Sequence, residues 1–110
     1  MTTAKAVAKY LRISPKKAVL AAGLIRGKSV DEAMLQLKHS NLKAGRLLVK
    51  TLSSAIANAE TQHNIRRDQM RVIEVRVDGG PRYKRARPKN KGGSHPILRR
   101  TSHFTVVVGE

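Results

Sequence analysis

A chain of 110 residues has room for one domain with one modest core. It carries 23 Lys and Arg against 7 Asp and Glu, a formal charge of +16, so a polyanion is needed to neutralise it and nucleic acid is the expected partner. The absence of cysteine excludes disulfides, thiolate metal sites and a cysteine nucleophile, and the absence of a long apolar run predicts a cytosolic protein with no membrane role.

The first predicted element is a strand over residues 4–12. Small apolar residues alternate there with other residues at a period of two, which is typical of a half-buried strand. One face would hold Lys5, Val7 and Lys9, and the other would hold Ala4, Ala6, Ala8 and Tyr10.

A helix is predicted to follow. Ser14 before Pro15 is a helix-start signal, because the hydroxyl can accept from first-turn amides and the proline gives up a donor that would be unpaired anyway. The helix should run to about Ile25 and leave Lys16 and Lys17 pointing outward. Its apolar face would consist of Ala18, Val19, Ala21, Ala22 and Ile25.

Two more helices are expected in the next third of the chain. Ser29 and Glu32 have the spacing of a capping box, after which a helix would run to about Lys38. Asn41 can cap a third and longer helix, whose apolar residues recur at intervals of three and four. The apolar face of this helix would consist of Ala44, Leu47, Leu48, Leu52, Ala55, Ile56 and Ala59.

The pattern changes to a period of two from residue 71. Ile73, Val75 and Val77 alternate with charged residues, and residues 104–108 supply a matching β-branched run. The stretches 71–78 and 103–108 should therefore pair as antiparallel strands.

The insert between these strands contains no acidic residue. Its basic residues are Arg82, Lys84, Arg85, Arg87, Lys89, Lys91, Arg99 and Arg100. Because the flanking strands pair, the insert must leave and return at the same place, and Gly92 and Gly93 near its middle suit a turn. We therefore predict an extended hairpin whose arms of about ten residues each reach roughly 30 Å.

The charge of the hairpin predicts contact with nucleic acid. Arginines can hold a phosphate with two donors each, and Tyr83 can either stack on a base or anchor the arm against the body. The four histidines show no metal-ligand spacing, and the seven acids form no acid–base pair. We expect no metal, no cofactor and no enzymatic activity.

Three sequence stretches resemble a known family. They are Tyr-Leu-Arg-Ile-Ser-Pro-Lys-Lys-Ala at 10–18, Ser-Ser-Ala-Ile-Ala-Asn-Ala-Glu at 53–60, and a hairpin run from Gly80 that ends in Ile-Leu-Arg-Arg-Thr-Ser-His at 97–103. With them the chain resembles, over nearly all of its length, the universal protein twenty-two family of the large ribosomal subunit in its bacterial form.

The resemblance implies an α+β fold. Three helices would pack on a small three-stranded antiparallel sheet, and a long β-hairpin would protrude from it. Residues 1–110 would form a single domain, with a body of 1–79 and 103–110 and an extended basic hairpin of 80–102.

The resemblance also implies a function, namely a structural constituent of the large ribosomal subunit that binds 23S rRNA, helps assembly and lines the nascent-peptide exit tunnel. Its partners would be that RNA, neighbouring large-subunit proteins and the nascent polypeptide, all in the cytoplasm. The expected rRNA-binding residues are Arg12, Ser14, Lys16, Lys17, Arg82, Tyr83, Lys84, Arg85, Arg87, Arg99 and Arg100. The expected tunnel-facing tip is Pro88, Lys89, Asn90, Lys91, Gly92 and Gly93.

Two other functions fit the same residues. A DNA-architectural protein also projects basic β-arms from a helical body and inserts an apolar wedge, for which Pro96 and Ile97 are candidates. Such arms usually act in symmetric dimers, and nothing in the sequence predicts a dimer interface. A free RNA chaperone or translational regulator would share the chemistry of a ribosomal protein.

Overall fold

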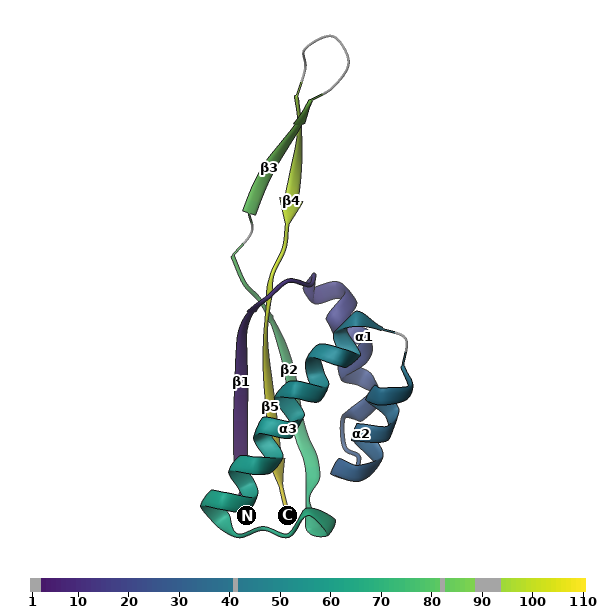
Figure 1. Cartoon of the computed structure of the whole chain (residues 1–110), viewed down its shortest axis with the longest axis vertical. Coiled ribbons are helices and arrows are strands. Elements are labelled where there is room, and N and C mark those ends of the chain that lie inside the picture. Colours follow the sequence, from purple (N-terminus) through teal and green to yellow (C-terminus); the bar gives the residue numbers. More distant parts are fainter. Residues whose placement is uncertain (1–2, 41, 82, 89–93) are drawn as a thin grey trace.

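The structure, a computed structural model, describes residues 3–40, 42–81, 83–88 and 94–110, with the backbone alone for 83–88 and 94–99. One layer of helices covers one face of a three-stranded sheet, and a hairpin extends beyond the end of that sheet (Figure 1). In chain order the elements are β1 Thr3–Leu11, α1 Pro15–Ile25, α2 Val30–His39, α3 Lys43–His63, the 3-10 helix η1 Arg67–Gln69, β2 Arg71–Gly79, β3 Tyr83–Pro88, β4 Ser94–Arg99 and β5 Ser102–Gly109.

The last strand of the chain is the central strand of the main sheet. The strand order is β1-β5-β2, and both neighbours run antiparallel to β5. Alternate residues of β5 from Ser102 to Val108 are fully buried under the helices, as the β-branched run predicts. The predicted pairing of 71–78 with 103–108 is confirmed.

The predicted face of β2 is wrong at one residue. Ile73 is 40% exposed, whereas Val72 and Val75 are buried. The register of β2 against β5 shifts between Val72 and Glu74, so an extra residue interrupts the period of two and turns Ile73 outward.

The predicted face of β1 also fails near its end. Ala4 and Ala6 are buried as expected, but Tyr10 is 59% exposed and has a φ of 60°. The pairing of β1 with β5 is irregular between Ala8 and Leu11, which removes Tyr10 from the alanine face.

Helix α1 has its predicted bounds, with Pro15 in the first turn. Most of its predicted apolar face is buried, but Val19 is 51% exposed because it follows Ala18 by 100° around the helix, outside the buried stripe. The Ser14 side chain does not cap the helix. Its carbonyl oxygen instead accepts from the amides of Lys17 and Ala18, each at 3.1 Å.

Helices α2 and α3 carry most of the remaining core. Ser29 Oγ accepts from the Glu32 amide at 3.4 Å, which is one half of the predicted capping box, and α2 runs one residue beyond the expected end. The N-cap position of α3 is Leu42 and not Asn41, which itself lies outside the described residues. The predicted apolar face of α3 is buried, with Leu47 half-buried.

The basic insert forms the predicted hairpin. Strands β3 and β4 pair antiparallel from Tyr83 opposite Arg99 to Pro88 opposite Ser94, in a two-stranded sheet separate from the main one. The predicted turn at Gly92 and Gly93 lies outside the described residues. The molecule is consequently elongated, with extents of 62 × 25 × 16 Å.

Candidate nucleic-acid interface

The base of the hairpin is tied to the connection between β1 and α1. The Gly80 amide donates to the Thr101 carbonyl at 2.9 Å, and Thr101 Oγ1 donates to the Pro81 carbonyl at 2.8 Å. Ser102 Oγ donates to the Ile13 carbonyl at 2.7 Å, and both hydroxyl-bearing residues are buried. We call this region, residues 10–17, 79–81 and 100–103, the junction.

Gly80 is required at the junction for reasons of space. A Cβ added there would clash with Thr101 Oγ1 and would lie 3.1 Å from His103 Cε1. The main chain at residue 80 therefore approaches the start of β5 more closely than a larger residue would allow.

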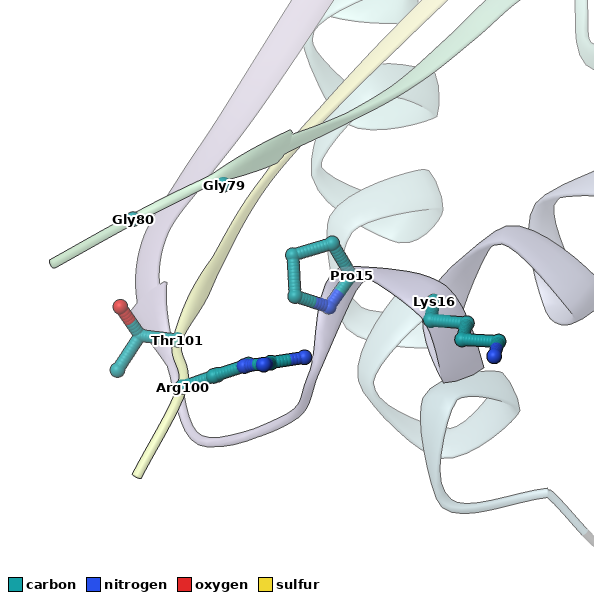
Figure 2. Close-up of a pocket in the computed structure, with 6 residues that line it drawn as sticks. All are labelled: Pro15, Lys16, Gly79, Gly80, Arg100 and Thr101. Atoms are coloured by element: carbon teal, nitrogen blue, oxygen red, sulfur yellow. The ribbon is translucent and has the colours of Figure 1, made fainter. Parts of the chain in front are cut away.

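An open cavity of about 360 Å³ lies within the junction. It is lined by Pro15, Lys16, Gly79, Gly80, Arg100 and Thr101. Figure 2 shows the Arg100 side chain extending beneath Pro15 towards the start of α1, while Lys16 points outward from the first turn. A guanidinium and an ammonium group beside the positive end of a helix form an environment that favours a phosphate.

The fold concentrates positive charge at this end of the molecule. No acidic residue precedes Asp31, and none occurs between Gly79 and Gly109. Because β1 pairs with β5 and α1 starts beside the hairpin base, these two acid-free stretches meet at the junction. The nearby Asp78 is paired with Arg76 at 3.4 Å.

The opposite end of the body carries paired charges. Arg67 is 2.9 Å from Asp31 and Arg66 is 3.1 Å from Asp68, all in exposed positions. The 3-10 helix η1, which contains Arg67 and Asp68, lies at the end of the body away from the hairpin (Figure 1). The charge of the molecule is thus polarised towards the junction and the hairpin.

The structure groups some of the predicted RNA-binding residues and separates others. Arg12, Ser14, Lys16, Lys17 and Arg100 come together at the junction, where the Lys43 ammonium donates to the Arg12 carbonyl at 2.8 Å. The hairpin strands carry Tyr83, Lys84, Arg85, Arg87, Pro88 and Arg99. Arg82 and the tip residues Lys89, Asn90, Lys91, Gly92 and Gly93 lie outside the described residues.

Sequence reasoning missed two of the residues that hold the junction together. Thr101 and Ser102 have no predicted role, whereas His103, next to the C-terminal strand, is predicted to be a structural residue. The structure shows all three bonded to the other chain segments of the junction. A run of three polar residues directly before the apolar run at 104–108 was the available signal. Their partners Ile13 and Pro81 are distant in sequence and carry no signal of their own.

The described residues contain no group of three or more His, Asp or Glu side chains placed to hold a metal ion. Within the same residues no helix is both long enough and apolar enough to span a bilayer.

Comparison with known proteins gives a consistent match. Residues 6–109 match the family described as ribosomal protein L22p/L17e. The large ribosomal subunit protein uL22 of Protochlamydia amoebophila is 68% identical over 108 residues, which cover 98% of this chain and 97% of the relative. The proteins of that name from Chlamydia abortus and Chlamydia trachomatis serovar L2 are 61% and 59% identical over 106 residues, 96% of each chain.

Proposed function

The chain belongs to the ribosomal protein L22p/L17e family, and on that premise we propose that its junction and hairpin bind 23S rRNA in a structural, non-enzymatic role. It is a constituent of the large subunit of the bacterial ribosome and acts in translation in the cytoplasm. The observation that carries the proposal is the meeting of two acid-free, cation-rich segments at the junction. Membership of a ribosomal family favours RNA over DNA as the polyanion.

The proposed contacts at the junction are with the RNA backbone. Arg100 offers a forked donor, Lys16 and Lys17 offer point charges in the exposed first turn of α1, and each replaces a counterion on a phosphate. Such contacts follow the shape of folded RNA and do not read base sequence. The buried hydroxyls of the junction fix the positions from which these side chains extend.

The hairpin is proposed to be stabilised by the RNA around it. An isolated two-stranded sheet is marginally stable in water, and β3 and β4 carry like charges. RNA phosphates would remove the repulsion between the arms. By family resemblance we propose that the tip, residues 88–93, faces the nascent polypeptide in the exit tunnel and that neighbouring large-subunit proteins are further partners.

The proposed RNA contacts at the junction predict a loss of RNA affinity when the cations that line its cavity are removed. Replacing Lys16 and Arg100 together by glutamine should weaken binding to large-subunit RNA and make the plot of log affinity against log salt shallower by about 1 to 2, because each phosphate contact contributes about 0.7 to 0.9. Filter binding across a salt series measures both quantities. The control is Arg66→Gln together with Arg67→Gln, which removes the same number of charges from exposed side chains at the other end of the body. An equal loss in the control would show that net charge and not the junction determines binding.

The tip proposal predicts a specific cross-link. The sequence has no cysteine, so Lys91→Cys provides a single attachment point for a photoreactive group. In ribosomes stalled during translation this group should capture the nascent chain, and the same group on Arg66→Cys should not. Gel analysis of a radiolabelled nascent chain detects the product. Incorporation of the labelled protein into the subunit without capture from residue 91 would contradict a tunnel-facing tip and leave the RNA contacts untouched.

A further inference from the structure

Tyr10 has an exposed aromatic side chain whose presence the packing of the core does not explain. The sequence has two tyrosines, one phenylalanine and no tryptophan, and Phe104 is fully buried. Tyr10 is 59% exposed, so its ring adds little to the core. An exposed aromatic ring in a chain this poor in aromatic residues points to a contact with a partner.

The backbone at Tyr10 adopts a conformation that bulky residues avoid. Its φ is 60°, in the left-handed region. The other non-glycine residue with positive φ among the described residues is Asn64, at the C-cap of α3, where asparagine is common. Tyrosine has no such local preference, and strain of this kind concentrates at functional positions.

His103 holds Tyr10 in place. The Tyr10 amide donates to His103 Nδ1 at 3.0 Å, and the two rings meet edge to face with centroids 4.9 Å apart and planes at 89°. An edge-to-face contact covers at most one face of the tyrosine ring. The hydrogen bond uses the main chain, which any residue other than proline would supply, so it does not explain the side chain.

The surroundings of Tyr10 are cationic. Lys9 and Arg12 flank it and are exposed, and no acidic residue precedes Asp31. His103 also lies against Gly80, which lines the cavity with Lys16 and Arg100. An uncovered aromatic face beside a phosphate-binding surface is the arrangement with which proteins hold unpaired bases.

We propose that Tyr10 is a stacking platform for an unpaired base of the large-subunit RNA, with His103 as the residue that positions it. The proposal rests on the proposed RNA-binding function and adds a base contact to the backbone contacts of the junction. The strained backbone and the edge contact present the ring before RNA arrives, so little side-chain freedom is lost on binding.

Substitutions of the ring test the platform. Tyr10→Leu should weaken binding of the full chain to transcribed large-subunit rRNA by about 5- to 100-fold, because base stacking on one aromatic side chain has an effect of this size. Tyr10→Phe should bind within about twofold of the unaltered protein, since it keeps the ring. The salt dependence should stay unchanged in both variants because neither alters a charge. Val7→Ala, on the same strand and 47% exposed, is the matched control.

A cycle of substitutions tests the positioning role of His103. His103→Ala should weaken RNA binding when Tyr10 is present and have little further effect in the Tyr10→Leu background. Additive losses would mean that His103 contacts RNA independently, and the positioning role would be wrong.

Tyrosine fluorescence tests the stacking platform separately from the proposed RNA-binding function. In a Tyr83→Phe background Tyr10 is the sole tyrosine of a chain without tryptophan, and stacking on a base should quench its emission. Three results would overturn the platform and leave RNA binding intact. The first is Tyr10→Leu binding as tightly as the unaltered protein, and the second is Tyr10→Phe binding as weakly as Tyr10→Leu. The third is RNA binding, seen by gel shift, without quenching of the tyrosine emission. Failure of the unaltered protein to bind the rRNA would overturn the proposed function itself.

Discussion

Excision of residues 82–99 will remove most of the affinity for large-subunit RNA and leave the body folded. The segment contains Arg82, Lys84, Arg85, Arg87, Lys89, Lys91 and Arg99. If the five cations outside the proposed tunnel-facing tip each meet a phosphate, the slope of log affinity against log salt becomes shallower by about 3 to 4, at roughly 0.7 per contact, and affinity falls by about a thousandfold in 0.1 M salt. Filter binding and retention in the large subunit through a high-salt wash measure the loss.

The body should survive the excision because the core lies elsewhere. Among the residues whose side chains the structure describes, the buried apolar ones belong to 4–75 and 104–108, and β3 and β4 pair with each other in their own sheet. The Gly80–Thr101 hydrogen bond already brings the two cut ends together, so an Asn-Gly turn can join Pro81 to Arg100. Circular dichroism should show unchanged helix content.

A neutral hairpin is the matched control for the excision. Replacing the seven cations by glutamine keeps the segment and removes its charge. This variant should bind RNA as weakly as the excised protein, because counterion release is the proposed source of affinity. Retention of most of the affinity by the neutral hairpin would show that shape and not charge holds it, and the electrostatic account would be wrong.

Local sequence patterns predicted the elements that depend on local rules. The spacing of three and four in α3 and the capping box at the start of α2 belong to single helices. The spacing is confirmed, and the capping box is confirmed for its Ser29 half. The faces of Ile73 and Tyr10 are wrong because register irregularities arise between paired strands. The residues next to a position in sequence do not reveal where the register between its strand and the partner strand shifts.

The same limit applies to the candidate site. The acid-free run after Gly79 predicted the hairpin, because charge and the need to return to β5 are both readable from the chain. The junction could not be predicted from the sequence, because the Ser102 hydroxyl donates to the carbonyl of Ile13, 89 residues earlier. The platform at Tyr10 likewise depends on His103, 93 residues away. Long-range hydrogen bonds of this kind appear only once the sheet is assembled.

Replacing Phe104 by alanine will cause the largest loss of stability among single substitutions of the body. Among the described side chains Phe104 is the largest that is fully buried, and it lies in the central strand, opposite Ala8 on one side and Val77 on the other. The free energy of unfolding should fall by about 3 to 5 kcal/mol, which combines lost transfer energy with an unfilled cavity. That is a large share of the roughly 5 to 15 kcal/mol typical of a domain.

Urea unfolding followed by circular dichroism measures the effect of Phe104→Ala, with Phe104→Leu expected to lose less because it leaves a smaller cavity. Val19→Ala is the exposed control and should change stability by less than about 0.5 kcal/mol. RNA at about one hundred times its Kd stabilises the folded state by only about 2.7 kcal/mol, so excess RNA should not fully restore Phe104→Ala. A loss below about 1 kcal/mol would mean that the helices do not pack on β5 as described. Because β5 begins at Ser102, such a result would also remove the support on which the junction depends.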